Sequence, residues 1–167
     1  CDANDSPTKL VKILIEQNMC PAIVFCLSRK RCVQMAESIT QSLMVSARPI
    51  KNKQTKDIEY DAQVLDWNNE VHNHRQRFHR FVKHYLSSWR NELENLPQYK
   101  EFIELLYKGV GYHHSGMIPI LRELVEVLFR EKLIMVVFAT ESLGVGIDMP
   151  ARTVIFTQLD KPVNHQY

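Results

Sequence analysis

The sequence predicts an α/β fold in which a parallel sheet carries helices on both faces. Two short apolar runs, residues 22–27 and 134–138, have the continuous hydrophobic character of strands that are buried on both sides. Residues 154–156 form a third candidate strand. Segments with helical periodicity lie between these runs. Strands that alternate with helices favour parallel connections, and we expect each strand to be buried on both faces.

The helices follow from the spacing of apolar residues. The first begins near Pro7 and cannot continue through Pro21. Ser28 follows the first strand as a helix N-cap, and a helix over about residues 29–43 is expected next. Residues 118–131 form another helix directly before the second apolar run. In such parallel sheets, ligands bind beyond the carboxyl ends of the strands.

Residues 48–98 depart from this alternation because they contain no run typical of a buried strand. We expect them to form a helical insertion within a single domain that spans residues 1–167. Residues 71–91 contain no acidic side chain, and apolar side chains recur there at helical spacing. The basic side chains of this segment are Arg75, Arg77, Arg80, Lys83 and Arg90. The apolar stripe comprises Trp67, Val71, Phe78, Phe81, Val82, Tyr85 and Trp89.

Two interpretations of this basic segment stay open. In the first, an amphipathic helix packs its apolar stripe on the domain and solvates its basic face. In the second, the basic face contacts nucleic-acid phosphates. The four histidines of the segment have no interleaved cysteine or carboxylate, which argues against a zinc site there.

Composition limits the classes of function. The chain has 167 residues, 45% of them hydrophobic, which is enough for one core but not for two full domains. A net charge of +2 predicts no global attraction to nucleic acid, so any such binding depends on local geometry. The four cysteines form no CxxC pair, which favours reduced thiols and an intracellular protein, nuclear or cytoplasmic. No apolar stretch approaches the length of a membrane span.

All five glycines lie between residues 109 and 146, in two clusters. Such clustering predicts turns that approach a ligand closely. The second cluster follows the second apolar run, and it places the hydroxyl of Thr140 and the carboxylate of Asp148 in one turn. Hydroxyls and backbone amides at a strand end can hold phosphate, and a carboxylate can accept from ribose hydroxyls. Close packing alone is the alternative explanation for these small residues.

Three stretches, residues 22–32, 111–119 and 138–156, resemble in their order the second RecA-like domain of superfamily 2 helicases. They are similar above all to the superkiller-type (Ski-like) DExH-box RNA helicases. The resemblance covers about residues 1–160 and includes residues 96–98 with the helix that follows them. Three motifs in order are more specific than any one of them alone.

The resemblance implies two sets of binding residues. The residues that would contact the nucleic-acid backbone are Ser28, Arg29, His114, Ser115, Gly116 and Thr140. Those that would meet the ribose side of ATP are Gly146 and Asp148. One turn would then contact both ligands and couple nucleotide state to the grip on RNA. Ser28 and Thr140 have a structural alternative, since each could simply cap a helix, and His113 is expected to pack or to bond backbone.

The chain contains neither the phosphate-binding GxxxxGK(S/T) loop nor the DExH box. Ligands for Mg²⁺ and for the phosphates of ATP are therefore expected from the first RecA-like domain. The arginine-rich motif of the family is expected beyond Tyr167. We expect no catalytic residue and no metal site in this chain, and no ATP hydrolysis by it alone.

The function that the resemblance implies is that of an ATP-dependent RNA helicase moving 3′ to 5′ on single-stranded RNA and unwinding duplexes for RNA processing or decay. Expected partners are single-stranded RNA, the first RecA-like domain and RNA-decay machinery, but no membrane. Contacts to phosphate and ribose predict little sequence preference. The alternatives are a DNA-directed superfamily 2 helicase and a non-catalytic RecA-like module that binds RNA or protein.

Overall fold

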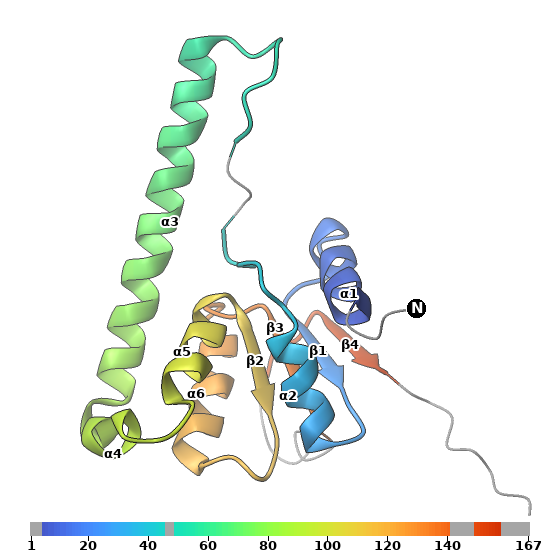
Figure 1. Ribbon diagram of the computed structural model, residues 1–167, viewed down its shortest axis with the longest axis vertical. Helices are drawn as coiled ribbons and strands as arrows, with labels where there is room; N and C mark the ends of the chain where they lie inside the picture. The colour runs from blue at the N-terminus through green and yellow to red at the C-terminus, as the bar shows by residue number, and fades with distance from the viewer. Residues whose placement is uncertain (1–4, 46–48, 141–148, 158–167) are drawn as a thin grey trace, which may run out of the picture.

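A four-stranded parallel sheet forms the centre of the computed structural model, which describes residues 5–45, 49–140 and 149–157. The strand order is β2-β3-β1-β4 (Figure 1). The strands are β1 (Ala22–Phe25), β2 (Val110–His113), β3 (Val136–Ala139) and β4 (Thr153–Phe156). The predicted α/β class is confirmed, and the arrangement is consistent with a RecA-like fold.

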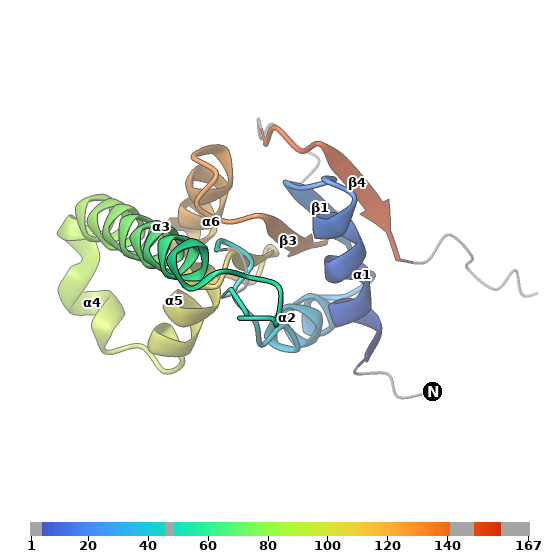
Figure 2. The same ribbon diagram turned by 90° about the horizontal axis from the view of Figure 1, so that it is seen from above.

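Helices cover both faces of the sheet (Figure 2). The covering helices are α1 (Asp5–Glu16), α2 (Arg29–Glu37), α5 (Tyr99–Tyr107) and α6 (Pro119–Arg130). Successive strand residues face opposite ways, so Val24 packs in the core cluster of α1 and α2 while Ile23 packs in the cluster of α6. Helix α5 flanks β2 and contributes Leu105 to the first cluster and Leu106 to the second.

The strand predictions hold in part. All four residues of β3 are buried, as the continuous apolar run predicts, and β1 is nearly as enclosed. In β4, by contrast, Val154 and Phe156 are 48% and 60% exposed. The expectation that every strand is buried on both faces is wrong for β4 in the described part of the chain. The apolar pattern of the sequence does not reveal strand β2.

Helix α2 is shorter than predicted. It ends at Glu37 rather than near residue 43. The amide of Leu43 donates to the carbonyl of Lys108 at 2.7 Å, a contact that draws the chain toward the start of β2 and away from the helix axis. A tertiary hydrogen bond therefore overrides the local helical pattern.

The segment between α2 and α5 is dominated by the long helix α3 (Asp57–Tyr85), followed by η1 (Ser87–Trp89) and α4 (Arg90–Glu94). With 29 residues, α3 is about 43 Å long. Its buried residues, His74, Phe78 and Val82, lie in its C-terminal half. The N-terminal half extends away from the sheet and its helices (Figure 1).

The amphipathic prediction for this segment is confirmed around Phe78 and Val82, which pack in the core cluster of α6. It is wrong for Trp89, which lies outside α3 in η1 and is 49% exposed.

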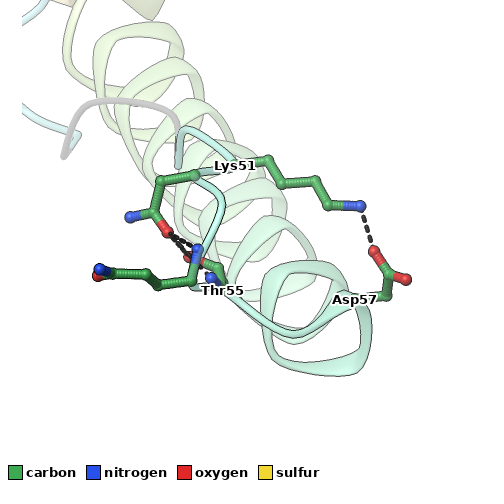
Figure 3. A network of polar contacts seen from close by, with 5 residues as sticks. Lys51, Thr55 and Asp57 are labelled. Atoms are coloured by element: carbon green, nitrogen blue, oxygen red, sulfur yellow. Dashed lines mark hydrogen bonds and ion pairs between the residues drawn. The ribbon is translucent and has the colours of Figure 1, made fainter.

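Polar contacts order the turn that leads into α3 (Figure 3). The side-chain carbonyl of Asn52 accepts from the amide of Thr55 at 2.9 Å and from its hydroxyl at 2.6 Å. Lys51 pairs with Asp57 in the first turn of the helix. Across the described residues, no helix has the length and apolar character needed to cross a membrane.

Candidate nucleic-acid interface

The carboxyl ends of the four strands lie level with one another. Ala139 of β3 is in register with His113 of β2 and with Phe25 of β1, and Phe25 is in register with Phe156 of β4. The residues that follow each strand therefore share one edge of the sheet. This is the edge where ligands bind in parallel α/β sheets.

Two of the predicted turns meet through a hydrogen bond between side chains. The Nη2 atom of Arg29 donates to the Oγ atom of Ser115 at 2.6 Å, and both residues are exposed. A Cβ atom on Gly116 would lie 3.0 Å from Nη1 of Arg29, so glycine gives the guanidinium room over the turn. Arginine carries five N–H donors, and the side-chain hydrogen bond of Arg29 within the described part of the chain is the one to Ser115, which leaves donors that can bind an anion at this edge.

Ser28 forms the N-cap of α2. Its Oγ atom accepts from the amide of Arg31 at 3.2 Å, which confirms the capping interpretation. The hydroxyl is exposed and retains its own proton as a donor. Capping therefore leaves Ser28 able to contact a phosphate oxygen.

His114 is held by its neighbours in a defined orientation. Its Nδ1 atom accepts from the amide of Gly116 at 3.1 Å, and its ring stacks on Tyr112 with the centroids 5.9 Å apart. Burial lowers the pKa of His114, and the positive charge of Arg29 lowers it further. The neutral ring that accepts at Nδ1 carries its proton on Nε2, so it offers one donor.

His113 is buried behind this edge, with 1% of its surface exposed. Its Nε2 atom lies 2.7 Å from Oε1 of Glu126 in α6. Burial lowers the pKa of His113 and outweighs the opposing effect of the Glu126 carboxylate. The expectation that His113 packs is confirmed, but its side chain bonds a carboxylate rather than the backbone. The sequence alone does not predict Glu126 as the partner of His113, because no local pattern links the two residues.

Thr140 is the first residue after β3, and its amide donates to the carbonyl of His113 at 3.2 Å. It is partly buried. The structure thus brings together at one edge all the predicted backbone-contacting residues: Ser28, Arg29, His114, Ser115, Gly116 and Thr140. The predicted ATP residues Gly146 and Asp148 lie outside the described residues, as does any helix that Thr140 would cap.

Comparison with known proteins identifies the family. The chain is 37% identical over 153 residues to the ATP-dependent RNA helicase mtr4 of Schizosaccharomyces pombe. It is 34% identical over 153 residues to the exosome RNA helicase MTR4 of Homo sapiens, and 34% identical over 141 residues to the human superkiller complex protein 2. These alignments cover 92%, 92% and 84% of the chain. The chain belongs to the superkiller-type DExH-box helicases of superfamily 2.

The chain spans only a small part of these helicases, 12%, 12% and 9% of their respective lengths. No family model matches it. By its alignments the chain corresponds to one segment of these longer relatives.

In the first glycine cluster of this segment, close packing explains glycines that the sequence predicts to face a ligand. Gly111 lies inside β2, where a Cβ atom would be 3.1 Å from Val125 and 3.2 Å from Ile134. Gly109 adopts a φ of +96° in the turn before β2, and a Cβ atom there would lie 2.9 Å from Met44. The prediction of a ligand-facing turn is wrong for Gly111, and of this cluster Gly116 lies in the exposed turn after β2.

Thr157 is a further residue at the shared edge that the sequence reasoning missed. It directly follows β4, and its Oγ1 atom donates to the carbonyl of Phe25 at 2.8 Å. Phe156 stacks on Phe25 with the ring centroids 5.2 Å apart. A threonine directly after a strand is the same signal that pointed to Thr140.

The N-terminal half of the basic helix α3 extends away from the sheet (Figure 1), whereas Cys26 directly follows β1 at this edge. Within the described ranges, no group of three or more His, Cys, Asp or Glu side chains could hold a metal ion. His74 is buried in α3 with Nε2 3.2 Å from the carbonyl of Tyr107. The cysteines that the structure describes, Cys20, Cys26 and Cys32, are free thiols.

Proposed function

We propose that the segment is part of the second motor domain of an ATP-dependent RNA helicase that moves 3′ to 5′ on single-stranded RNA. The observation that carries this proposal is the contact between Arg29 and Ser115 at the carboxyl edge of the sheet, with Thr140 at the end of the next strand. The names of the relatives as RNA helicases support it. In this proposal residues 48–98 are an insertion in one RecA-like domain spanning residues 1–167.

The proposed RNA contacts are made to phosphate and ribose. Arg29 supplies a positive charge, and the hydroxyls of Ser28 and Ser115 supply donors. The neutral His114 adds one more donor without adding charge. Contacts from these donors to phosphate oxygens carry no sequence information, so the enzyme is expected to track RNA with little sequence preference.

ATP enters the proposal through the turn after Thr140. Gly146 and Asp148 are proposed, on the resemblance alone, to meet the ribose side of ATP at the cleft with the first RecA-like domain. That domain would supply the phosphate and Mg²⁺ ligands, so the segment alone is not expected to hydrolyse ATP. Two relatives are named for the exosome and for the superkiller complex, which supports RNA-decay machinery as a partner.

The test uses the intact protein and compares its ATPase stimulation by single-stranded RNA and by single-stranded DNA of the same sequence. Greater stimulation by RNA, together with displacement of duplexes that carry a 3′ but not a 5′ overhang, is the expected result. Equal or greater stimulation by DNA would favour the DNA-directed alternative. An intact protein that binds RNA but has no ATPase activity would be a non-catalytic module.

A further inference from the structure

A concavity of about 320 Å³ lies directly beside the turn that Arg29 and Ser115 hold together. The turn itself contributes His114 and Gly116 to its lining. Residues 96–98, which precede α5, also line it, together with residues of α2, α5, β2 and α6. The concavity therefore lies between the proposed insertion and the proposed phosphate contacts.

Aromatic rings dominate one part of this lining. Tyr112 stacks on His114 with only 9° between the ring planes, and Phe102 meets Tyr112 edge-on with centroids 5.3 Å apart. Tyr99 adds a further partly buried ring. Among the described residues that line the concavity none carries an acidic side chain, so this lining does not repel an adjacent phosphate. Planar aromatic surfaces next to phosphate donors are the recurring design of single-strand binding sites.

Gln98 adds a polar group and an unusual backbone to the same site. Its φ is +63°, a left-handed conformation that non-glycine residues adopt at a cost of about 1 kcal/mol or more. Its side chain makes no capping hydrogen bond to α5 and is exposed at the lining. The amide of Gln98 carries both donors and an acceptor, so it can bond to the edge of any base.

We propose that this concavity receives one base of the RNA strand whose phosphates lie on the turn of Arg29 and Ser115. The inference rests on the proposed function and adds a base subsite to it. A single base is favoured over a protein segment because His114 and Gly116 belong both to the concavity and to the proposed phosphate contacts. Stacking on Tyr99 or His114 accepts every base, which agrees with little sequence preference.

The test measures RNA affinity of the intact protein with a uridine oligomer in which one abasic nucleotide is moved along the strand. An abasic nucleotide at one position should weaken binding about fivefold to a hundredfold, the range for the stacking of one base on an aromatic ring. Gln98 and Ile118 both line the concavity, so this penalty should shrink in Gln98→Gly and Ile118→Ala variants. Glycine adopts the backbone of position 98 without strain, and Ile118 is 43% exposed, so both variants should fold.

The matched control is Ile58→Ala, which truncates an 86% exposed isoleucine in the first turn of α3 and should leave the penalty unchanged. RNA binding with no sensitive position would overturn the subsite and leave the proposed function intact. A penalty that is undiminished in both variants would also overturn it. If the variants instead lose a protein partner while RNA binding is unaltered, the concavity is a peptide site. Absence of any RNA binding would refute the proposed function itself.

Discussion

Arg29 and Ser115 are 86 positions apart in the sequence, yet their side chains meet at 2.6 Å and join the turns after β1 and β2. If this pair holds RNA phosphate, Arg29→Ala in the intact protein should reduce the salt-dependence slope of RNA binding by about one. Stability should change little, because an interaction between exposed side chains contributes about 1 kcal/mol or less. The measurement is RNA affinity at several salt concentrations.

Lys30→Ala is the matched control because Lys30 has the same charge, follows Arg29 directly in α2 and is also exposed. Its slope should stay close to that of the wild type. A second check is the double variant of Arg29 and Ser115. Its loss of RNA-binding free energy should be less than the sum of the losses in the two single variants. Equal decreases of the salt-dependence slope in Arg29→Ala and Lys30→Ala would indicate that Arg29 attracts RNA only through diffuse electrostatics and makes no specific contact.

Replacement by alanine is expected to affect stability at one glycine of the first cluster and RNA binding at another. In Gly111→Ala the new Cβ meets Val125 and Ile134 in a packed core, which should cost about 1–3 kcal/mol of stability. In Gly116→Ala it meets the flexible end of Arg29, which can move aside. Hydrogen exchange of β2 and RNA affinity, both measured in the intact protein, separate the two effects.

Gly111→Ala should accelerate exchange in β2, and Gly116→Ala should weaken RNA binding with exchange nearly unchanged. The reverse pattern would contradict the assignment of Gly111 to packing and of Gly116 to the interface.

How far the sequence predicts the fold depends on what each element needs from distant residues. Strands β1 and β3 are recognisable because both faces are buried and the apolar run is continuous. Strand β2 is not, since Gly111 breaks the pattern and is explained only by its contacts with Val125 and Ile134. The end of α2 is also hidden from the sequence, because the bond from Leu43 to Lys108 is tertiary.

The candidate site shows the same difference between features that the local sequence predicts and features that depend on distant residues. The order of the motifs pointed to Arg29 and Ser115 as separate contacts, but only the register of the strands brings them together. Glu126 could not be predicted, since its role depends on the packing of α6 against His113. Local sequence patterns therefore identify residues that can contact a phosphate, and the register of the sheet determines which of these residues lie side by side.

Thr140→Val tests the hydroxyl at the end of β3. Valine keeps the β-branched shape that suits the strand end and removes the hydroxyl proposed to bind phosphate. RNA-stimulated ATPase activity of the intact protein should fall more than basal activity. Thr157→Val is the comparison at another strand end: it removes a hydroxyl that donates to the carbonyl of Phe25, and its loss should affect both activities equally. Equal losses in Thr140→Val would indicate structural damage alone.

The basic face of α3 supplies a prediction about the second interpretation of that helix. Arg75, Arg77 and Arg80 are all exposed on α3. If they only solvate the helix, replacing all three with glutamine should leave the salt-dependence slope of RNA binding unchanged. A slope that falls by two or more would place this face on the nucleic acid. Glutamine keeps helix propensity, so helicity by circular dichroism should be preserved.

Acid should loosen the region around β2. Burial is the main reason that the pKa values of His74, His113 and His114 are lowered from 6.5, so all three stay neutral to a lower pH in the folded state than in the unfolded chain. Between the lowered values and 6.5 the unfolded chain binds more protons than the folded chain. Stability from these groups is therefore complete above about pH 6.5 and is lost as the pH falls below it.

His113→Gln isolates one of these groups, since glutamine can still donate to Glu126 but does not titrate. Amide exchange in β2 and α6 is compared between the intact variant and the wild type at each pH. The ratio of the variant's exchange rate to that of the wild type should be lower at pH 5.5 than at pH 7.5. Comparing the two proteins at the same pH removes the intrinsic pH dependence of exchange. His72→Gln is the control, because His72 is exposed on α3. A wild-type response that His113→Gln does not reduce would assign the acid sensitivity to His74 and His114.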